Sequence, residues 1–173
     1  MPRRDDLESI MVLGSGPIKI GQAAEFDFSG SQAVRALRED GYKVILVNSN
    51  PATIQNDPEM ADVVYIEPLL PDTIAKILEK ERPCALLAGM GGQTALNIAS
   101  ELSHNGTLER LGVELIGSDL DAIDKAEDRE LFNQVCESIN LPISQAVACN
   151  SIDEVIAAAE LLSLIHISEP TRR

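Results

Sequence analysis

Short runs of apolar residues recur along the chain, and longer amphipathic stretches, in which apolar residues return every three or four positions, lie between them. Short apolar runs bounded by turn residues are typical of strands buried on both faces of a sheet, and the longer period is typical of helices with one buried face. The pattern predicts strands at residues 10–13, 44–47, 63–66, 85–88 and 113–116. It predicts helices over residues 29–40, from residue 71 onward and over 93–103.

This alternation of strands and helices predicts the fold class. Strands that are joined through helices run parallel, and right-handed crossovers place the helices on both faces of the sheet. We therefore expect an α/β fold with an open, mostly parallel, doubly wound, Rossmann-like sheet. Ligands of such sheets bind at the carboxyl ends of the strands.

The pattern changes after Gly117, where helices are predicted over 119–126, 128–139 and 151–162, with a short strand at 145–148. Ser151 and Glu154 have the spacing of a helix capping box. The sequence predicts one domain over 1–117 and an incomplete second region over 118–162. Residues 163–173 break the helical pattern and are either a non-native tail, like those on incomplete gene fragments, or a frayed terminus, so His166 is left out of the functional argument.

Charge and composition exclude several classes of function. Asp and Glu number 28 against 14 Lys and Arg, a formal net charge of −14, and aromatic residues make up only 3% of the chain. Such a surface repels phosphate backbones and offers few stacking platforms, so we expect no nucleic-acid partner. Cys84, Cys136 and Cys149 lack metal-ligand spacing and are expected to be free thiols. Neither a signal peptide nor a run of about 18 apolar residues is present, which predicts a cytoplasmic protein without membrane contact.

The glycines after the first predicted strand match neither of two familiar nucleotide-binding motifs. The dinucleotide fingerprint that starts Gly14-x-Gly16 needs a glycine where Lys19 stands. It also needs an acidic residue after the second strand, where the sequence has Asn48-Ser-Asn50. The glycine spacing of a P-loop is present at Gly16 to Gly21, but Gln22-Ala23 follows in place of Lys-Ser/Thr.

Three of the predicted strands nevertheless run into glycine- or asparagine-rich loops that should meet along one rim of the sheet. These loops either orient a ligand or only form turns and helix caps, and the residues leave both alternatives open. Glu25 and Asp27 are expected in the first loop, where carboxylates suit a neutral or cationic species better than a bare anion. The candidate rim residues are Gly14, Gly16, Gly21, Gln22, Asn48, Asn50, Gly91, Gly92 and Gln93.

Taken together, the loops resemble the large chain of carbamoyl phosphate synthetase, in its first half. The resemblance rests on Gly14-x-Gly-Pro-Ile-x-Ile-Gly-Gln-Ala-x-Glu-Phe-Asp-x-Ser-Gly30, Val47-Asn-Ser-Asn-Pro-Ala-Thr-Ile54, Met90-Gly-Gly-Gln-Thr-Ala-Leu-Asn97 and Asp121-Ala-Ile-Asp-Lys-Ala-Glu-Asp-Arg129. It implies a pre-ATP-grasp domain over 1–117, followed by the start of an ATP-grasp domain.

The resemblance also implies an activity. The full-length enzyme would be an ATP-dependent ligase that makes carbamoyl phosphate from bicarbonate, glutamine-derived ammonia and ATP, for arginine and pyrimidine biosynthesis. Its cofactors would be ATP with Mg²⁺ or Mn²⁺, and a small glutaminase chain would supply the ammonia. No catalytic residue and no metal ligand of the family falls within this chain, so we expect the isolated chain to be inactive and not to bind ATP tightly.

Four residues match functional positions of the family. Arg129 matches a nucleotide-contacting arginine, whose guanidinium can donate to phosphate oxygens; otherwise it is a solvated helix charge. Ile18, Ala23 and Glu25 match the ammonia-tunnel region, although Ile18 and Ala23 equally suit core packing. Two other readings are kept: a related ATP-grasp ligase such as biotin carboxylase, and a stand-alone nucleotide-binding or interaction module.

Overall fold

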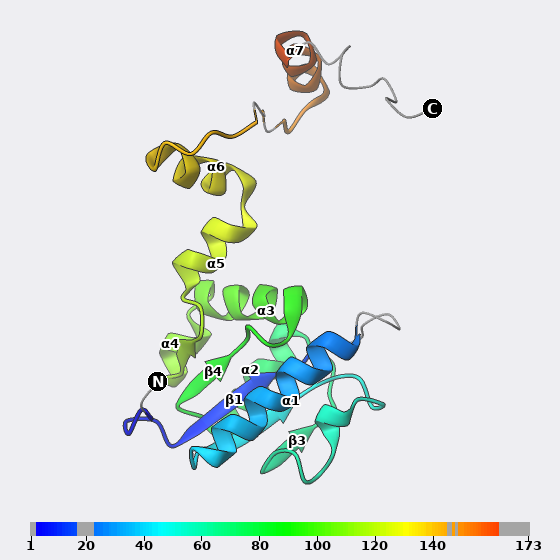
Figure 1. Cartoon of the computed structure of the whole chain (residues 1–173), viewed down its shortest axis with the longest axis vertical. Coiled ribbons are helices and arrows are strands. Elements are labelled where there is room, and N and C mark those ends of the chain that lie inside the picture. Colours follow the sequence, from blue (N-terminus) through cyan, green and yellow to red (C-terminus); the bar gives the residue numbers. More distant parts are fainter. Residues whose placement is uncertain (1–2, 17–22, 145–146, 148, 163–173) are drawn as a thin grey trace. The chain divides into compact units, whose positions relative to one another are not determined.

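A computed structural model describes residues 3–16, 23–144, 147 and 149–162, except for the side chains of residues 23 and 24. Within these residues the chain forms two compact units, 1–124 and 125–173, which are described separately below. The first unit contains a sheet with helices on both faces (Figure 1). None of its described helices, nor any described helix of the second unit, is long and apolar enough to cross a membrane.

Five parallel strands form the sheet of the first unit, in the order β3-β2-β1-β4-β5. The strands are β1 (Ser9–Leu13), β2 (Lys43–Val47), β3 (Val63–Tyr65), β4 (Ala85–Leu87) and β5 (Glu114–Ile116). The chain winds outward from β1 through β2 to β3, and then returns to the other side of β1 to form β4 and β5. This order confirms the predicted doubly wound α/β fold and places a topological switch point between β1 and β4.

Helices cover the two faces of the sheet unequally (Figure 1). The elements outside the sheet are α1 (Ala23–Glu39), the 3₁₀ turn η1 (Ile54–Asn56), α2 (Pro71–Glu81), α3 (Gly92–His104) and α4 (Thr107–Leu111). α1 packs on the face that carries Ile10 and Val12 of β1. α2, α3 and α4 pack on the opposite face, which carries Met11 and Leu13. Because alternate residues of β1 enter different cores, the whole strand is apolar, and each fully buried side chain stabilises the fold by about 1.5–3 kcal/mol.

α1 begins six residues before the predicted start at residue 29, so the sequence-based boundary was wrong. The predicted helix began at Ser29. In the structure the Ser29 hydroxyl donates to the Glu25 carbonyl at 3.0 Å, a bond made inside the helix. Glu25 and Asp27 therefore lie on the first turns of α1 and not in the preceding loop.

Two short elements, η1 and α4, escaped prediction because three and five residues are too few to show a helical period. Positive φ angles at Gly106 and Gly112 bound α4 on either side. Of the strand predicted at 145–148, only Val147 is described, and it is not in a strand.

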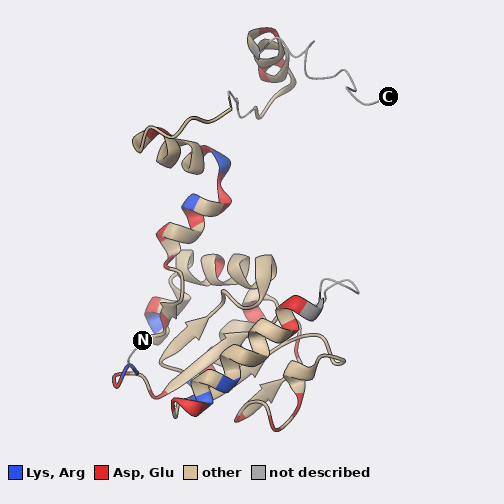
Figure 2. Ribbon diagram, in the orientation of Figure 1, with Lys and Arg blue, Asp and Glu red and all other residues tan. Residues whose placement is uncertain are grey.

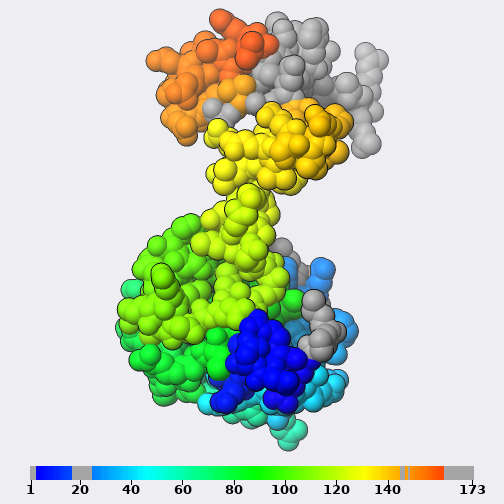
Figure 3. Space-filling model, turned by 90° about the vertical axis from the view of Figure 1, so that its left-hand side faces the viewer, coloured from blue at the N-terminus to red at the C-terminus, as the bar shows by residue number. Residues whose placement is uncertain are grey.

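The N-terminal residues lie against the first unit (Figure 3). The Tyr42 hydroxyl accepts a hydrogen bond from the Arg4 backbone N–H at 2.8 Å and donates to the Arg4 carbonyl at 3.2 Å. The Arg4 guanidinium forms an ion pair with Glu114 at 2.6 Å, which links the N-terminal segment to β5. This contact lowers the pKa of the Glu114 carboxyl.

The second unit contains the end of α5 (Leu120–Glu127), α6 (Arg129–Ser138) and α7 (Ile152–Leu162). Asp128 caps α6 by accepting from the backbone N–H groups of Glu130 and Leu131. At α7 the Ser151 hydroxyl accepts from the Glu154 N–H, as in a capping box, but the Glu154 carboxylate accepts from Asn150 and not from Ser151. Apolar side chains remain exposed here, among them Phe132, Ile139, Val155 and Leu161. A complete domain buries such residues.

Candidate functional site

Described parts of the three candidate loops meet at the carboxyl edge of the sheet, beside the switch point. The Gly14 N–H donates to the Val47 carbonyl at 2.8 Å, and the Gly16 N–H donates to the Asn48 side-chain oxygen at 3.1 Å. A Cβ atom added at Gly91 would lie 2.5 Å from the Gly14 carbonyl oxygen. The loops after β1, β2 and β4 are therefore in contact at one place, as their positions in the sequence predicted.

Asn48 fastens the first loop to the second. Its side chain is completely buried, and its oxygen accepts from the N–H groups of Gly16 and Asn50. Its amide nitrogen donates to the Gln55 side-chain oxygen at 3.2 Å. Because the oxygen already accepts two bonds and the side chain has no exposed surface, Asn48 shapes the loop and does not present its amide to a ligand.

Gln55 is the central residue of the site, and sequence reasoning missed it. It is completely buried in η1, and its amide nitrogen donates to the Phe26 carbonyl at 2.9 Å and approaches Asp27 at 3.4 Å. Its amide also leaves no room for a side chain at two glycines. A Cβ atom at Gly30 would lie 2.6 Å from the Gln55 nitrogen, and one at Gly14 would lie 2.8 Å from the Gln55 oxygen. A polar residue in an otherwise unpatterned loop gave no sequence signal for this role.

Asp27 connects the start of α1 to both loops. One of its carboxylate oxygens accepts from the Thr53 hydroxyl at 2.7 Å and, more weakly, from the Ser15 hydroxyl at 3.4 Å. The Thr53 hydroxyl also caps η1. Asp27 is thus a fixed acceptor of local hydrogen bonds, whereas Glu25 is exposed on the first turn of the same helix.

The third loop begins α3. Gly91 is the residue before the helix and makes no side-chain cap, so the first backbone N–H groups of α3 have no side-chain partner from it. These N–H groups lie at the positive end of the helix dipole. Gly92 has a φ of 67°, and a Cβ atom there would lie 3.2 Å from the Phe26 ring. Glycine is therefore required at both positions for the loop to reach the rim.

The remaining second-loop residues are mainly engaged in turn formation. The Asn50 side-chain oxygen accepts from the Ala52 N–H at 3.0 Å, and the Asn50 carbonyl accepts from the Asn56 side chain at 2.6 Å. Ser49 is different, because its buried hydroxyl has no hydrogen-bond partner among the described residues. That hydroxyl lies close to Gly16, at 3.7 Å from the position of a Cβ atom there. In the third loop Gln93 is exposed and donates to Asn97 at 2.9 Å.

Arg129 lies in the second unit, at the first position of α6. It lines a hollow of about 660 Å³ together with the amide side chains of Asn133, Gln134 and Asn150 and the carboxylates of Glu130 and Glu137. The Asp128 carboxylate caps the helix, and no ion pair of Arg129 is present within the residues described. Its guanidinium thus has no ion-pair partner in the described part of the chain, in a hollow that also carries two carboxylates.

Across residues 3–16, 23–144, 147 and 149–162, no group of three or more His, Cys, Asp and Glu residues could hold a metal ion. Acidic residues occur on several helices and loops, including the start of α1, where Glu25 and Asp27 lie (Figure 2). The described rim is thus built from amides, hydroxyls, glycines and one fixed carboxylate. It can position loops and a polar or uncharged molecule, but it provides no acid–base pair.

Comparison with known proteins decides the family. The model of the carbamoyl phosphate synthase preATP-grasp domain matches residues 6–125, more than half of the chain. The chain belongs to this family. A carbamoyl phosphate synthase large chain from Methanothrix thermoacetophila is 55% identical over 170 residues, which cover 98% of this chain and 16% of that protein. A carbamoyl phosphate synthase large chain, N-terminal section, from Aquifex aeolicus is 56% identical over 170 residues. These residues cover 98% of this chain and 30% of that protein.

The chain therefore spans about 16% of the full large chains that it matches. Solved structures show the same fold at lower identity. The biotin carboxylase domain dimer of Hydrogenobacter thermophilus 2-oxoglutarate carboxylase, in complex with MgADP, ADP and bicarbonate, matches at TM-score 0.63 and 16% identity over 90% of this chain and 33% of that one. The biotin carboxylase domain of a single-chain bacterial carboxylase matches at TM-score 0.60 and 12% identity, over 90% of this chain and 34% of that one.

In this preATP-grasp domain, the structure brings together the described rim residues Gly14, Gly16, Asn48, Asn50, Gly91 and Gly92. Gly21, Gln22 and Ile18 lie outside the described residues. Ala23 is the first residue of α1, and its side chain also lies outside the description. Arg129 belongs to the other unit, and its contact with the nucleotide stays a prediction.

Proposed function

We propose that the chain forms the opening part of the first synthetic half of a glutamine-hydrolysing carbamoyl phosphate synthetase. In the complete protein this half would make carboxyphosphate from bicarbonate and ATP, and then carbamate with ammonia. The observation that carries the proposal is the rim of a domain in this family, where described parts of three loops meet and the buried side chains of Asn48 and Gln55 join the first two loops and the start of α1.

The rim would serve as a rigid support for neighbouring catalytic parts. Hydrogen bonds that do not involve a ligand join the described part of the loop after β1 and the start of α1 to the loop after β2. Such preorganisation lowers the entropy lost when reacting groups are positioned. The exposed Glu25, on the first turn of α1, would border the ammonia path together with Ile18 and Ala23.

Arg129 would bind ATP. A guanidinium is always charged and offers several N–H donors, which suit phosphate oxygens. The guanidinium has no ion pair in the described part of the chain, and amide side chains line the same hollow, together with the carboxylates of Glu130 and Glu137. Bound Mg²⁺ or Mn²⁺ would neutralise phosphate charge, and its ligands would come from other parts of the complete protein. A small glutaminase chain would supply ammonia.

A chimera tests the role of Arg129. Residues 1–162 of this chain would replace the corresponding part of a related full-length large chain, and bicarbonate-dependent ATP hydrolysis would be measured. We expect Arg129→Ala to raise the KM for ATP, or lower kcat/KM, by about 10- to 100-fold, because one charged phosphate contact contributes about 1.5–3 kcal/mol.

Arg110→Ala is the matched control. Arg110 is also an exposed arginine, but its partner is Glu79 at 2.9 Å and exposed ion pairs contribute little. Equal ATP kinetics in the Arg129→Ala chimera and its parent would contradict the proposed phosphate contact. A biotin carboxylase reading is less well supported, because those proteins share the fold at only 12–18% identity.

A further inference from the structure

The start of α1 is held at three points, and the second loop supplies two of them. The Gln55 amide nitrogen donates to the Phe26 carbonyl at 2.9 Å. The Thr53 hydroxyl donates to the Asp27 carboxylate at 2.7 Å. Gly92, at the start of α3, lies against the Phe26 ring, since a Cβ atom there would be 3.2 Å from it. The second and third loops therefore both fix the start of this helix.

Glu25 directly precedes these anchored residues, and its own side chain is exposed. Its backbone carbonyl accepts from the Ser29 hydroxyl. Within residues 3–16, 23–144, 147 and 149–162, its carboxylate forms no hydrogen bond and no ion pair. Helix ends fray where tertiary contacts do not hold them. The direction of the Glu25 side chain therefore depends on the contacts of its neighbours, Phe26 and Asp27.

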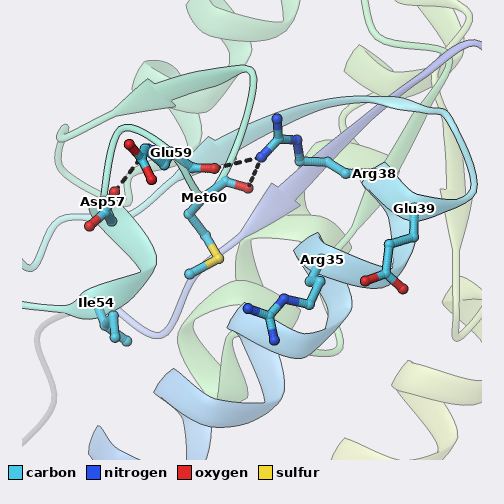
Figure 4. Close-up of a pocket in the computed structure, with 7 residues that line it drawn as sticks. All are labelled: Arg35, Arg38, Glu39, Ile54, Asp57, Glu59 and Met60. Carbon is cyan, nitrogen blue, oxygen red and sulfur yellow. Dashed lines mark hydrogen bonds between the residues drawn. The ribbon is translucent and has the colours of Figure 1, made fainter.

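The turn after η1 is itself fixed to the far end of the same helix. Arg38, in the last turn of α1, donates to the carbonyl oxygens of Glu59 and Met60 (Figure 4). Its guanidinium also lies 3.7 Å from the Asp62 carboxylate, which accepts from the Val44 N–H of β2 at 2.8 Å. η1 and this turn are thus tied to the sheet and to the end of α1. Loss of a bond at the near end would loosen the helix start and leave the rest in place.

We propose that Thr53 and Gln55 are positioning residues for ammonia delivery and act through Glu25. This role rests on the proposed function, in which Glu25 borders the ammonia path. Ammonia is neutral and can donate N–H hydrogen bonds, which a carboxylate accepts only over a narrow range of distance and angle. Thr53 and Gln55 set that geometry, because they hold Asp27 and Phe26 next to the carboxylate.

These bonds should matter more for ammonia transfer than for the chemistry of ATP. Arg129, the proposed phosphate contact, lies on α6, which none of these bonds involves. In the proposed function, ATP hydrolysis driven by bicarbonate alone needs no ammonia, whereas carbamoyl phosphate formation does. A loosened Glu25 should therefore separate the two activities.

The chimera described above, assembled with its glutaminase partner, tests this role. The measured quantities are carbamoyl phosphate formed per glutamine hydrolysed and bicarbonate-dependent ATP hydrolysis. Thr53→Val keeps the shape of the side chain and removes the hydroxyl that bonds Asp27. It should lower the ratio about 3- to 10-fold more than it lowers ATP hydrolysis, the effect of one ordinary hydrogen bond. Gln55→Met removes the donor to the Phe26 carbonyl and should act in the same direction.

Thr53→Ser is the rescue variant, because it keeps the hydroxyl, and its ratio should stay within about 2-fold of the parent chimera. Tyr65→Phe is the matched control. It removes another hydroxyl-to-carboxylate bond of 2.7 Å, to Glu81, outside the three loops, and should leave the ratio at the parent value. Circular dichroism establishes that each chimera is folded, and Gln55→Met decides where Thr53→Val fails to fold.

The parent ratio in folded Thr53→Val and Gln55→Met chimeras would overturn this role. So would an equal loss of ATP hydrolysis, a Thr53→Ser chimera as uncoupled as Thr53→Val, or the same loss in Tyr65→Phe. A folded parent chimera that makes no carbamoyl phosphate is a separate result, because it would overturn the proposed function itself and this role with it.

Discussion

Buried amides, more than charged groups, hold the candidate site in shape at the scale of single residues. Asn48 and Gln55 are both fully buried, and the bond between them joins the loop after β2 to η1. Each unsatisfied buried polar group costs about 1–3 kcal/mol, so such a network has one well-defined arrangement. The network also explains why two glycines are needed beside it, at Gly14 and Gly30.

Gly30 gives a direct test of this network. Glycine inside a helix is normally less stable than alanine by about 1 kcal/mol. Here Gly30→Ala should instead destabilise the first unit by about 1–3 kcal/mol, because the new methyl group would meet the Gln55 amide at 2.6 Å. Urea unfolding followed by circular dichroism measures the change.

The double variant Gly30→Ala/Gln55→Ala provides the control. Once the Gln55 amide is removed, the alanine at position 30 should be neutral or stabilising relative to Gln55→Ala alone. An equal cost of Gly30→Ala in both backgrounds would show that the collision with Gln55 does not explain the glycine.

At the scale of elements, the buried strands were predictable and the contacts between loops were not. Val44 to Val47 lies in a continuous apolar run, which indicates a central strand without knowledge of its neighbours. The predicted start of α1 was six residues late, and the glycine inside this helix, Gly30, packs against Gln55, which lies 25 residues further along the chain. The roles of Asp27 and Gln55 depend on such long-range contacts, which periodicity does not reveal.

The packing of α2 on the sheet includes a pH-sensitive contact. The Glu81 carboxylate, only 14% exposed, accepts from the Tyr65 hydroxyl at 2.7 Å and pairs with Lys43 of β2 at 3.3 Å. The hydrogen bond from Tyr65 and then the contact with Lys43 lower the pKa of Glu81 below its ordinary value. A lowered folded-state pKa stabilises the fold above the unfolded value, about 4.3, and this stabilisation is lost as the pH falls through the folded value.

We therefore predict that Glu81→Gln costs about 1 kcal/mol at pH 7 and that this difference shrinks as the pH falls below about 4.3. Urea unfolding at several pH values measures it. Glu79→Gln is the matched control, because Glu79 is 46% exposed and its pair with Arg110 should contribute little at any pH. A cost of Glu81→Gln that is the same at pH 3 and pH 7 would contradict the linkage.

At the scale of the whole molecule, the chain matches one part of much longer relatives. It spans 16% of the large chains that it resembles at 55–57% identity. The α/β fold could be predicted from the alternation of apolar runs and amphipathic stretches, and the family from the loop sequences, whose glycines and amides are residues that shape the rim. The use of Arg129 could not be tested in the same way, because nucleotide binding needs convergent groups from more than one element.

Carbamoyl phosphate formation by the chimera tests the central claim most directly. Residues 1–162 of this chain, placed at the start of a related large chain with its glutaminase partner, should support synthesis from bicarbonate, glutamine and ATP within about 10-fold of the parent enzyme, since a properly formed rim leaves the barrier within about 1.4 kcal/mol of the original. A folded chimera that makes no carbamoyl phosphate and hydrolyses no ATP in response to bicarbonate would contradict it.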